Sequence, residues 1–198
     1  QKPGSMIGID YASSMIAAAN VQKDLTFPSN DNIRFCVGDI LNLDFKDNTF
    51  DVVYTTRVLI NLPTWESQKQ AITECLRVAK PGSTVVFAEG CWEPLCRLNS
   101  MRLVSGLLPL NEHDFNRYLK IEKMKEFLNM SGNSYEINDF SSIYYIGSRL
   151  IRELLLGQEK RKNTGFINSF NEEFYNLERK FSAPGMGVQQ IFAVTKAK

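Results

Sequence analysis

The sequence has almost no net charge and no long apolar run. Lys and Arg number 23 against 22 for Asp and Glu, a formal net charge of +1, which excludes the strongly basic surface that binds nucleic acid or an anionic membrane. No apolar stretch approaches the roughly 18 residues of a transmembrane helix, and no basic-then-apolar secretory signal is seen. We therefore expect a cytoplasmic protein that binds neither nucleic acid nor membrane.

The cysteines and glycines do not form the motifs that bind metals or dinucleotides. The cysteines lack metal-ligand spacing, so we predict no metal site and expect buried, reduced thiols rather than disulfides. They are Cys36, Cys75, Cys91 and Cys96. The G-x-G-x-x-G pattern of dinucleotide-binding domains occurs nowhere in the sequence. Its absence argues against the competing enzymatic interpretation, a nicotinamide-dependent enzyme.

Short apolar runs alternate with helical patterns through the first half of the chain. Strand patterns cover 5–9, 33–37, 50–56 and 83–89, and helical patterns cover 13–23 and 64–80. Met15, Ile16 and Ala19 form the apolar face of the first helix, and Thr64 is suited to cap the second. This alternation predicts a parallel sheet covered by helices.

The second half departs from this alternation. Helical patterns cover 94–108, 121–130, 143–157 and 166–181, a polar irregular segment covers 109–119, and strand patterns cover 134–141 and 187–197. The chain is long enough to bury one substantial core. We therefore expect a single domain over residues 1–198, with residues 91–120 and 143–182 forming a helical cap on the substrate side.

Two acids end successive predicted strands. Asp10 follows the first strand and Asp39 follows the second, and ligands of open α/β sheets lie beyond the carboxyl ends of the strands. A carboxylate at the position of Asp10 can accept hydrogen bonds from a ribose diol. Asp39 could accept one from an adenine amino group. The alternative is that both acids only form turns and helix caps, which Asp favours anyway.

Four segments in order resemble the class I S-adenosylmethionine-dependent methyltransferases. They are "GIDYASSMI", "FCVGDILNLDF", "FDVVYTTRVLINL" and "RVAKPGSTVVFAE". The resemblance covers Gly4 to about Glu89, and the last pattern, "GVQQIFAVTKA", fits the antiparallel closing strand of that family. It implies an α/β, Rossmann-like, doubly wound and mostly parallel sheet with an antiparallel last strand and a helical cap inserted in the C-terminal half.

The resemblance also implies S-adenosylmethionine as cofactor and names its site. Asp10 would hold the ribose, with the residues after it beside the adenine, while Asp39 and the following apolar residue would hold the adenine ring. The end of the third strand would lie beside the methionyl part. The implied cofactor-binding residues are Asp10, Tyr11, Met15, Asp39, Ile40, Thr56 and Arg57.

One family motif is absent from the sequence: the acid and glycines that follow the family's first strand. In the family that strand lies between the strands of "SMIGI" and "FDVVYTT", which would otherwise have bare edges. We therefore expect the natural protein to carry roughly 40 to 50 further residues upstream, enough for a helix, the strand and a glycine loop. A catalytically silent, methyltransferase-like scaffold or partner subunit is the alternative that this departure leaves open.

The acceptor site is expected in the segment after the fourth predicted strand. His113, the only histidine, is the candidate base there, although a solvated loop histidine is the competing interpretation. Arg117, Tyr118 and Tyr144 are the candidate acceptor-binding residues. "FNRYL" and "NDFSSIYYIGSRLI" are similar to methyltransferases of bacterial surface polysaccharides and nucleotide sugars. This implies a hydroxyl or amine on a sugar-like or phosphorylated small molecule, and a homodimer is left open.

Overall fold

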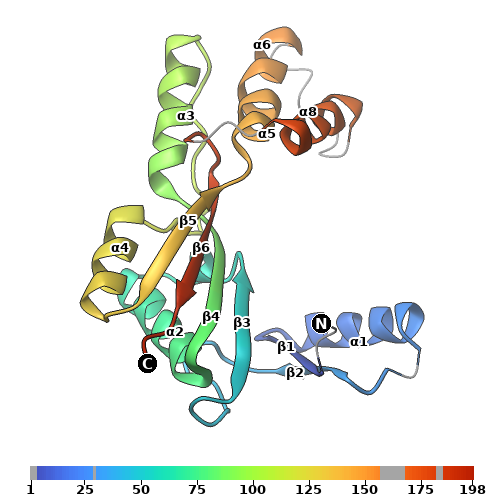
Figure 1. Ribbon diagram of the computed structural model, residues 1–198. Coiled ribbons are helices and arrows are strands. Elements are labelled where there is room, and N and C mark those ends of the chain that lie inside the picture. The colour runs from blue at the N-terminus through green and yellow to red at the C-terminus, as the bar shows by residue number, and fades with distance from the viewer. Residues whose placement is uncertain (1–3, 29, 157–167, 182–184) are drawn as a thin grey trace.

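The computed structural model describes residues 4–28, 30–156, 168–181 and 185–198. Its strands lie in two sheets with helices packed around them (Figure 1). The smaller sheet pairs β1 (Met6–Asp10) with β2 (Ile33–Val37) in parallel. The larger one has the order β3 (Phe50–Thr56), β4 (Ala79–Gly90), β6 (Gln189–Thr195), β5 (Ser134–Asp139). The expected α/β class is confirmed, and among the described residues no strand joins the two sheets.

The larger sheet contains the main core. β3 and β4 are parallel, while β6 is antiparallel to both β4 and β5. Val85 and Phe87 of β4 and Phe192 and Val194 of β6 are buried. They alternate with other side chains along each strand, because successive residues of a strand point to opposite faces. The core therefore lies along the two central strands.

Helix α2 (Trp65–Val78) covers this core and begins as predicted. The Thr64 side chain accepts a hydrogen bond from the Ser67 amide, and Ser67 reciprocates in a capping box. Ile72 and Leu76 are buried on the inner face. The helix ends earlier than the predicted residue 80 because β4 begins at Ala79, and the residue before Pro81 disfavours helical geometry.

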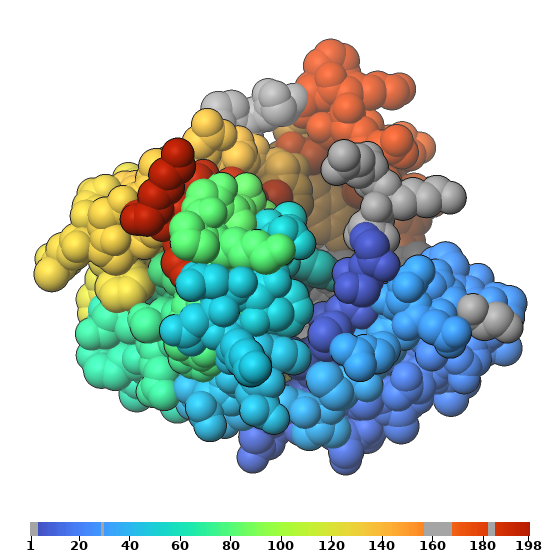
Figure 2. All heavy atoms as spheres, turned by 60° about the horizontal axis from the view of Figure 1, so that its bottom comes forward, coloured from blue at the N-terminus to red at the C-terminus, as the bar shows by residue number. Residues whose placement is uncertain are grey.

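The N-terminal unit consists of the smaller sheet and the helix between its two strands, and it has no core comparable to that of the larger sheet. Helix α1 (Ser13–Thr26) contains no buried residue, and its predicted inner face includes Met15, which is 58% exposed. Figure 2 shows this unit, in blue, at one side of the molecule beside the cyan atoms of the region around β3. Among the described residues, β1 and β3 each have one edge without a paired strand. The expectation that a further strand lies between them stays a prediction.

The remaining helices gather beyond the end of the larger sheet where β4 leads into α3 (Figure 1). They are α3 (Trp92–Val104), α5 (Ser142–Ile146), α6 (Arg152–Leu156) and α8 (Ser169–Lys180), while α4 (Ile121–Met130) lies beside the sheet. Helix α3 begins two residues before the predicted residue 94 and ends before the predicted residue 108. It ends early because Gly106 takes a positive φ of 74°. No helix among the described residues combines the length and apolarity that crossing a bilayer requires.

The predicted helix over 143–157 is interrupted by a π-helical turn at Gly147–Ile151. A Cβ at Gly147 would lie only 2.0 Å from the Phe174 ring, so glycine permits the close approach of α8. Helix and strand periodicity carries no signal for such a turn. Residues 157–167 and 182 of the predicted cap segment lie outside the described residues.

The cysteines follow the expectation only in part. Cys75 and Cys91 are buried, Cys96 is half-buried and Cys36 is exposed on the smaller sheet, which has little core around it. All four are free thiols. Burial raises the pKa of the Cys75 thiol to about 12 and also raises that of Cys91, so both favour the unreactive thiol form.

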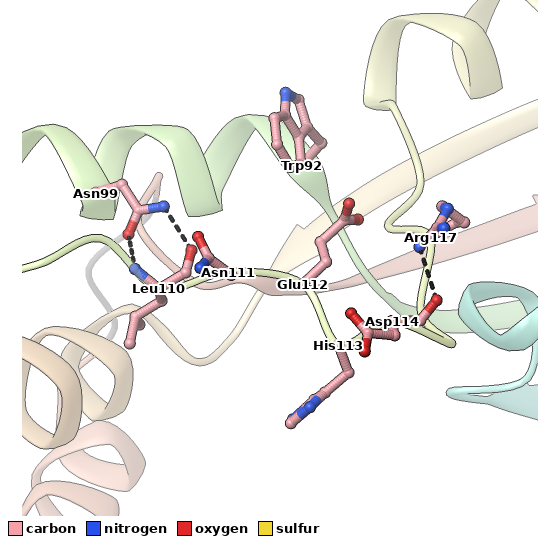
Figure 3. A pocket seen from close by; sticks show the side chains of 8 residues that line it. All are labelled: Trp92, Asn99, Leu110, Asn111, Glu112, His113, Asp114 and Arg117. Carbon is pink, nitrogen blue, oxygen red and sulfur yellow. Dashed lines mark hydrogen bonds between the residues drawn. The ribbon is translucent and has the colours of Figure 1, made fainter.

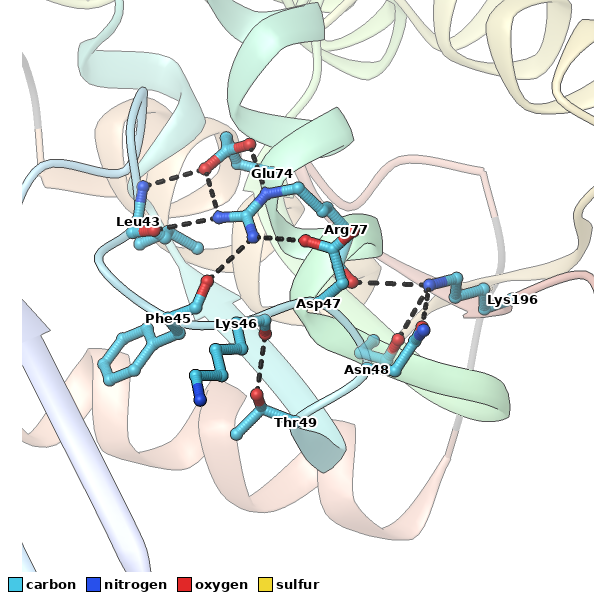
Figure 4. A network of polar contacts seen from close by, with 10 residues as sticks. Leu43, Phe45, Lys46, Asp47, Asn48, Thr49, Glu74, Arg77 and Lys196 are labelled. Carbon is cyan, nitrogen blue, oxygen red and sulfur yellow. Dashed lines mark hydrogen bonds and ion pairs between the residues drawn. The ribbon is translucent and has the colours of Figure 1, made fainter.

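Arg77 ties α2 to the loop between the two sheets (Figure 4). Its guanidinium binds Glu74 through two hydrogen bonds of 2.7 and 2.8 Å and Asp47 at 2.7 Å. It also donates to the carbonyl oxygens of Phe45 and Leu43. This hydrogen bonding to Arg77 lowers the pKa of Glu74 despite opposing desolvation.

We expect the Arg77→Met variant to be less stable at neutral pH and to depend less on pH in acid. Because the pKa of Glu74 is lowered on folding, its contribution is present above its ordinary value of 4.5 and is lost as the pH falls through the lower folded value. Urea unfolding at about pH 7 and about pH 3.5 measures both effects. Lys80→Met, which removes an exposed pair with Asp51, is the control and should change little. An equal loss in both variants would contradict this role.

Candidate functional site

The structure brings Asp10 and Asp39 to the same edge of the β1–β2 sheet. Asp10 pairs with Val37, and the Gly38 amide donates to the Asp10 carbonyl oxygen at 3.0 Å, so Asp39 follows directly. In each acid Oδ1 accepts a main-chain N–H two residues along, at 2.8 Å. Among the described residues Oδ2 of both acids has no protein donor. The turn-forming role and a ligand-binding role are therefore compatible.

The other predicted cofactor residues lie on two parts of the structure: Tyr11, Met15 and Ile40 follow the two acids in the chain, whereas Thr56 and Arg57 lie at the end of β3. Tyr11 and Met15 are 80% and 58% exposed, and Ile40 is half-buried against the main core. Thr56 ends β3, and Arg57 follows it with an unusual φ of 56°. The Arg57 amide donates to the Ala88 carbonyl oxygen at 2.9 Å, which fixes this turn beside β4. Positive φ in a residue other than glycine is often found at functional sites.

Glu89 at the end of β4 was not among the predicted site residues. Its carboxylate is fully buried and accepts hydrogen bonds from Thr55 and from the amides of Val58 and Ile60. An acid at the carboxyl end of a strand is the same signal that drew attention to Asp10 and Asp39. The pattern "STVVFAE" contained that signal, so the sequence alone could have identified Glu89.

The predicted irregular segment forms one wall of a cavity of about 420 Å³ below Trp92 (Figure 3). The Glu112 carboxylate accepts a hydrogen bond from the Tyr118 amide, and Asn99 holds Leu110 by hydrogen bonds at 2.8 and 2.9 Å. His113 lines the cavity, but its ring points away from Trp92. The cavity wall is thus held in place mainly by side chains other than His113.

His113 and Arg117 both lie at this wall. The His113 ring stacks on Phe115 with centroids 5.4 Å apart, and both side chains are exposed. The Arg117 guanidinium donates to the carbonyl oxygens of Asp114 and Asn116 within its own loop. His113 is therefore accessible to a small molecule, and its role as a base stays a prediction.

Tyr118 and Tyr145 come together with two arginines. A Cβ at Gly90 would be 3.3 Å from the Tyr118 ring, which places this ring over the end of β4, and Tyr145 packs against the same cap core. Burial raises the pKa of both phenols, and the charges of Arg57 and Arg149 oppose that rise. Tyr144 packs edge-on against Tyr145, and its amide donates to Glu178. The charge of Arg57, predicted for the cofactor, thus acts on Tyr118, predicted for the acceptor.

The chain is similar to known proteins both in sequence and in structure. Residues 1–87 match the family described as methyltransferase domain. The demethylmenaquinone methyltransferase of Lactiplantibacillus plantarum is 40% identical over 89 residues, which are 45% of this chain and 36% of that protein. The chain thus spans about a third of the length of the curated relatives it matches.

The structural likenesses extend over nearly the whole chain. A geranyl diphosphate methyltransferase in complex with SAM has a TM-score of 0.60 at 15% identity, covering 98% of this chain and 69% of that one. The C-methyltransferase for geranyl diphosphate from Streptomyces coelicolor, in complex with S-adenosyl-L-homocysteine, has a TM-score of 0.59 at 15% identity, covering 96% and 62%. Residues 1–87 are therefore similar in sequence to a methyltransferase domain, and the chain has an α/β fold similar to those of solved methyltransferases.

Proposed function

We propose that the protein transfers a methyl group from S-adenosylmethionine to a small-molecule acceptor. The observation that carries the proposal is the pair of carboxylates, Asp10 and Asp39, at the carboxyl end of the β1–β2 sheet. This sheet lies within the residues that match a methyltransferase domain. Each keeps Oδ2 clear of protein donors among the described residues, so the pair suits a ribose diol and an adenine amino group. When bound, the cofactor supplies an already activated methyl group.

The remaining cofactor contacts are proposed from the same geometry. Tyr11, Met15 and Ile40 offer apolar surface to the adenine, since the first two are exposed and the third lies beside Asp39. Thr56 and Arg57 lie at the end of β3 and would face the methionyl part. The cytoplasmic location stays a prediction.

Cofactor binding is tested by Asp10→Ala. Losing hydrogen bonds from its carboxylate to the ribose should cost roughly 2 to 4 kcal/mol, because bonds to a charged group contribute about 1.5 to 3 kcal/mol each before discounting for solvent. Isothermal calorimetry with S-adenosylmethionine measures the loss on the full natural protein. Asp31→Ala, another exposed acid of the N-terminal unit, is the matched control. An affinity for S-adenosylmethionine within about twofold of wild type in a folded Asp10→Ala protein would show that Asp10 does not bind the ribose.

The same calorimetry separates an enzyme from the alternative, a catalytically silent scaffold or partner subunit. Such a scaffold would give no heat with S-adenosylmethionine, because it would not bind the cofactor. A binding heat that Asp10→Ala abolishes and Asp31→Ala preserves would favour the enzyme.

For the acceptor, we propose a hydroxyl or amine on a sugar-like or phosphorylated small molecule. The positive charges of Arg57 and Arg149 act on Tyr118 and Tyr145 at the end of β4, and guanidinium groups suit phosphate or carboxylate oxygens. Tyr118, Tyr144 and Arg117 would contact the acceptor. His113 would take the proton of an acceptor hydroxyl, while alignment supplies most of the remaining rate.

An apolar acceptor is the second candidate. The cap exposes Leu103, Val104 and Leu108 at 58%, 91% and 70%, and several of the curated relatives are demethylmenaquinone methyltransferases. Labelled S-adenosylmethionine offered with nucleotide sugars, sugar phosphates and a demethylated quinone distinguishes the two classes. Transfer of the label to the quinone alone would contradict the sugar-like acceptor and support the apolar one.

A further inference from the structure

Glu89 is a buried acid for which the proposed chemistry has no use. Its exposed fraction is 0%, and no ion pair of the described residues includes it. Burying a carboxylate without a cation is costly unless hydrogen bonds compensate. Desolvation raises the pKa of Glu89, and hydrogen bonds from Thr55 and the following turn oppose the rise.

Those hydrogen bonds come from the turn after β3. Glu89 Oε1 accepts from the Val58 amide at 3.1 Å and from Thr55 Oγ1 at 3.0 Å, and Oε2 accepts from the Ile60 amide at 3.4 Å. These amides belong to a backbone that begins at Arg57 with φ 56° and continues into a short 3-10 helix, Leu59–Asn61. The Glu89 carboxylate therefore stabilises an unusual backbone conformation by accepting hydrogen bonds from the main-chain N–H groups of that turn.

The same turn is joined to the wall that carries the acceptor residues. The Arg117 amide donates to the Ile60 carbonyl oxygen at 2.6 Å, and the Asn116 side chain donates to Asn61 Oδ1 at 2.8 Å. The buried Gln68 side chain bridges both segments, donating to the Leu59 carbonyl oxygen at 3.1 Å and to that of Arg117 at 2.7 Å. Glu89, the turn and residues 112–118 thus form one hydrogen-bonded unit.

We propose that Glu89 is a positioning residue, which fixes residues 57–61 and through them sets the acceptor wall against the donor side of the site. The proposal rests on the proposed function, because only methyl transfer requires this alignment. Glu89 itself touches neither reactant. It acts through the main chain of the turn, which carries Arg57 on one side and contacts Asn116 and Arg117 on the other.

The test is Glu89→Gln, which keeps the shape but turns one acceptor oxygen into a donor. At least one of the amides of Val58 and Ile60 then faces another N–H group. In the protein without ligands, we expect amide hydrogen exchange to accelerate about 10- to 100-fold at 57–62 and 112–118, with other segments unchanged. With the acceptor from the screen, kcat should fall about 10- to 100-fold while the Kd for S-adenosylmethionine stays within about threefold.

Glu74→Gln is the matched control. Glu74 also accepts a main-chain N–H, from Leu43, but contacts neither the turn nor the acceptor wall. Its replacement should lower the urea midpoint and leave exchange at 57–62 and 112–118 at the wild-type rate. Faster exchange over the whole Glu89→Gln protein would indicate a purely structural role and overturn the proposal, as would unchanged exchange in those two segments.

A second variant covers the case in which Glu89→Gln does not fold. Asn61→Ala removes the part-buried link from the turn to Asn116 and the hydrogen bond from its own side chain to the Arg57 carbonyl oxygen, so it should accelerate exchange at 112–118 as well as in the turn. Unchanged exchange at 112–118 would overturn the coupling. Because exchange is measured without cofactor, a wild-type protein that fails to bind S-adenosylmethionine would contradict the proposed function and still leave this inference tested.

Discussion

Turnover of the His113→Ala protein is expected to fall about 100- to 10,000-fold, which is the usual contribution of a general base. His113 is exposed on the wall of the cavity below Trp92, where a hydroxyl acceptor can reach its imidazole. Binding of S-adenosylmethionine should stay nearly intact, because Asp10 and Asp39 lie at the carboxyl end of the β1–β2 sheet, whereas His113 lies in the loop between α3 and α4. Steady-state kinetics and calorimetry on the same preparation measure the two quantities.

The pH dependence offers an independent check of His113. Imidazole groups change charge between about pH 5 and 8, and only the neutral form accepts a proton. If His113 is the base, the wild-type rate should rise with pH as the base loses its proton, and the His113→Ala protein should lose that limb. Phe115→Leu, which removes the stacked ring and keeps the imidazole, is the matched control. A variant with turnover within about threefold of wild type would make His113 a bystander and leave positioning as the source of rate.

Arg102→Met is expected to destabilise the protein by about 3 to 5 kcal/mol, the cost of breaking a buried ion pair from one side. The Arg102 and Glu153 side chains are 2% and 1% exposed, and their charged atoms are 2.7 Å apart. Arg102 also donates to the carbonyl oxygens of Leu108 and Arg149, so one side chain joins α3 to the π-helical turn. Urea unfolding measures the loss.

The double variant Arg102→Met, Glu153→Leu distinguishes charge from packing. Replacing both partners removes the buried carboxylate that has lost its bond to Arg102, so stability should recover in large part. Lys125→Met, which breaks an exposed pair with Glu122, should change stability little. A double variant no more stable than Arg102→Met would show that the cap depends on the shape and hydrogen bonds of Arg102 rather than on its charge.

Local patterns determined much of the fold. The strands over 33–37 and 50–56 lie where periodicity predicts them, and Thr64 caps α2 through Ser67, three residues away. Asp10 and Asp39 could be identified as site candidates because each follows a strand within its own short motif. These features depend on neighbours in the chain, and the physical preferences that create them act over a few residues.

Contacts between distant segments were decided only by the tertiary structure. Strand order, the separation into two sheets and the unburied face of α1 depend on which surfaces meet, and a periodic pattern marks an apolar face without naming what covers it. Glu89 meets Val58 and Ile60, Asn116 meets Asn61, and Arg102 meets Glu153 across 51 residues of chain. A buried polar group must find a partner wherever the fold provides one, so the sequence alone determined which residues could serve the site, and packing decided which of them act together.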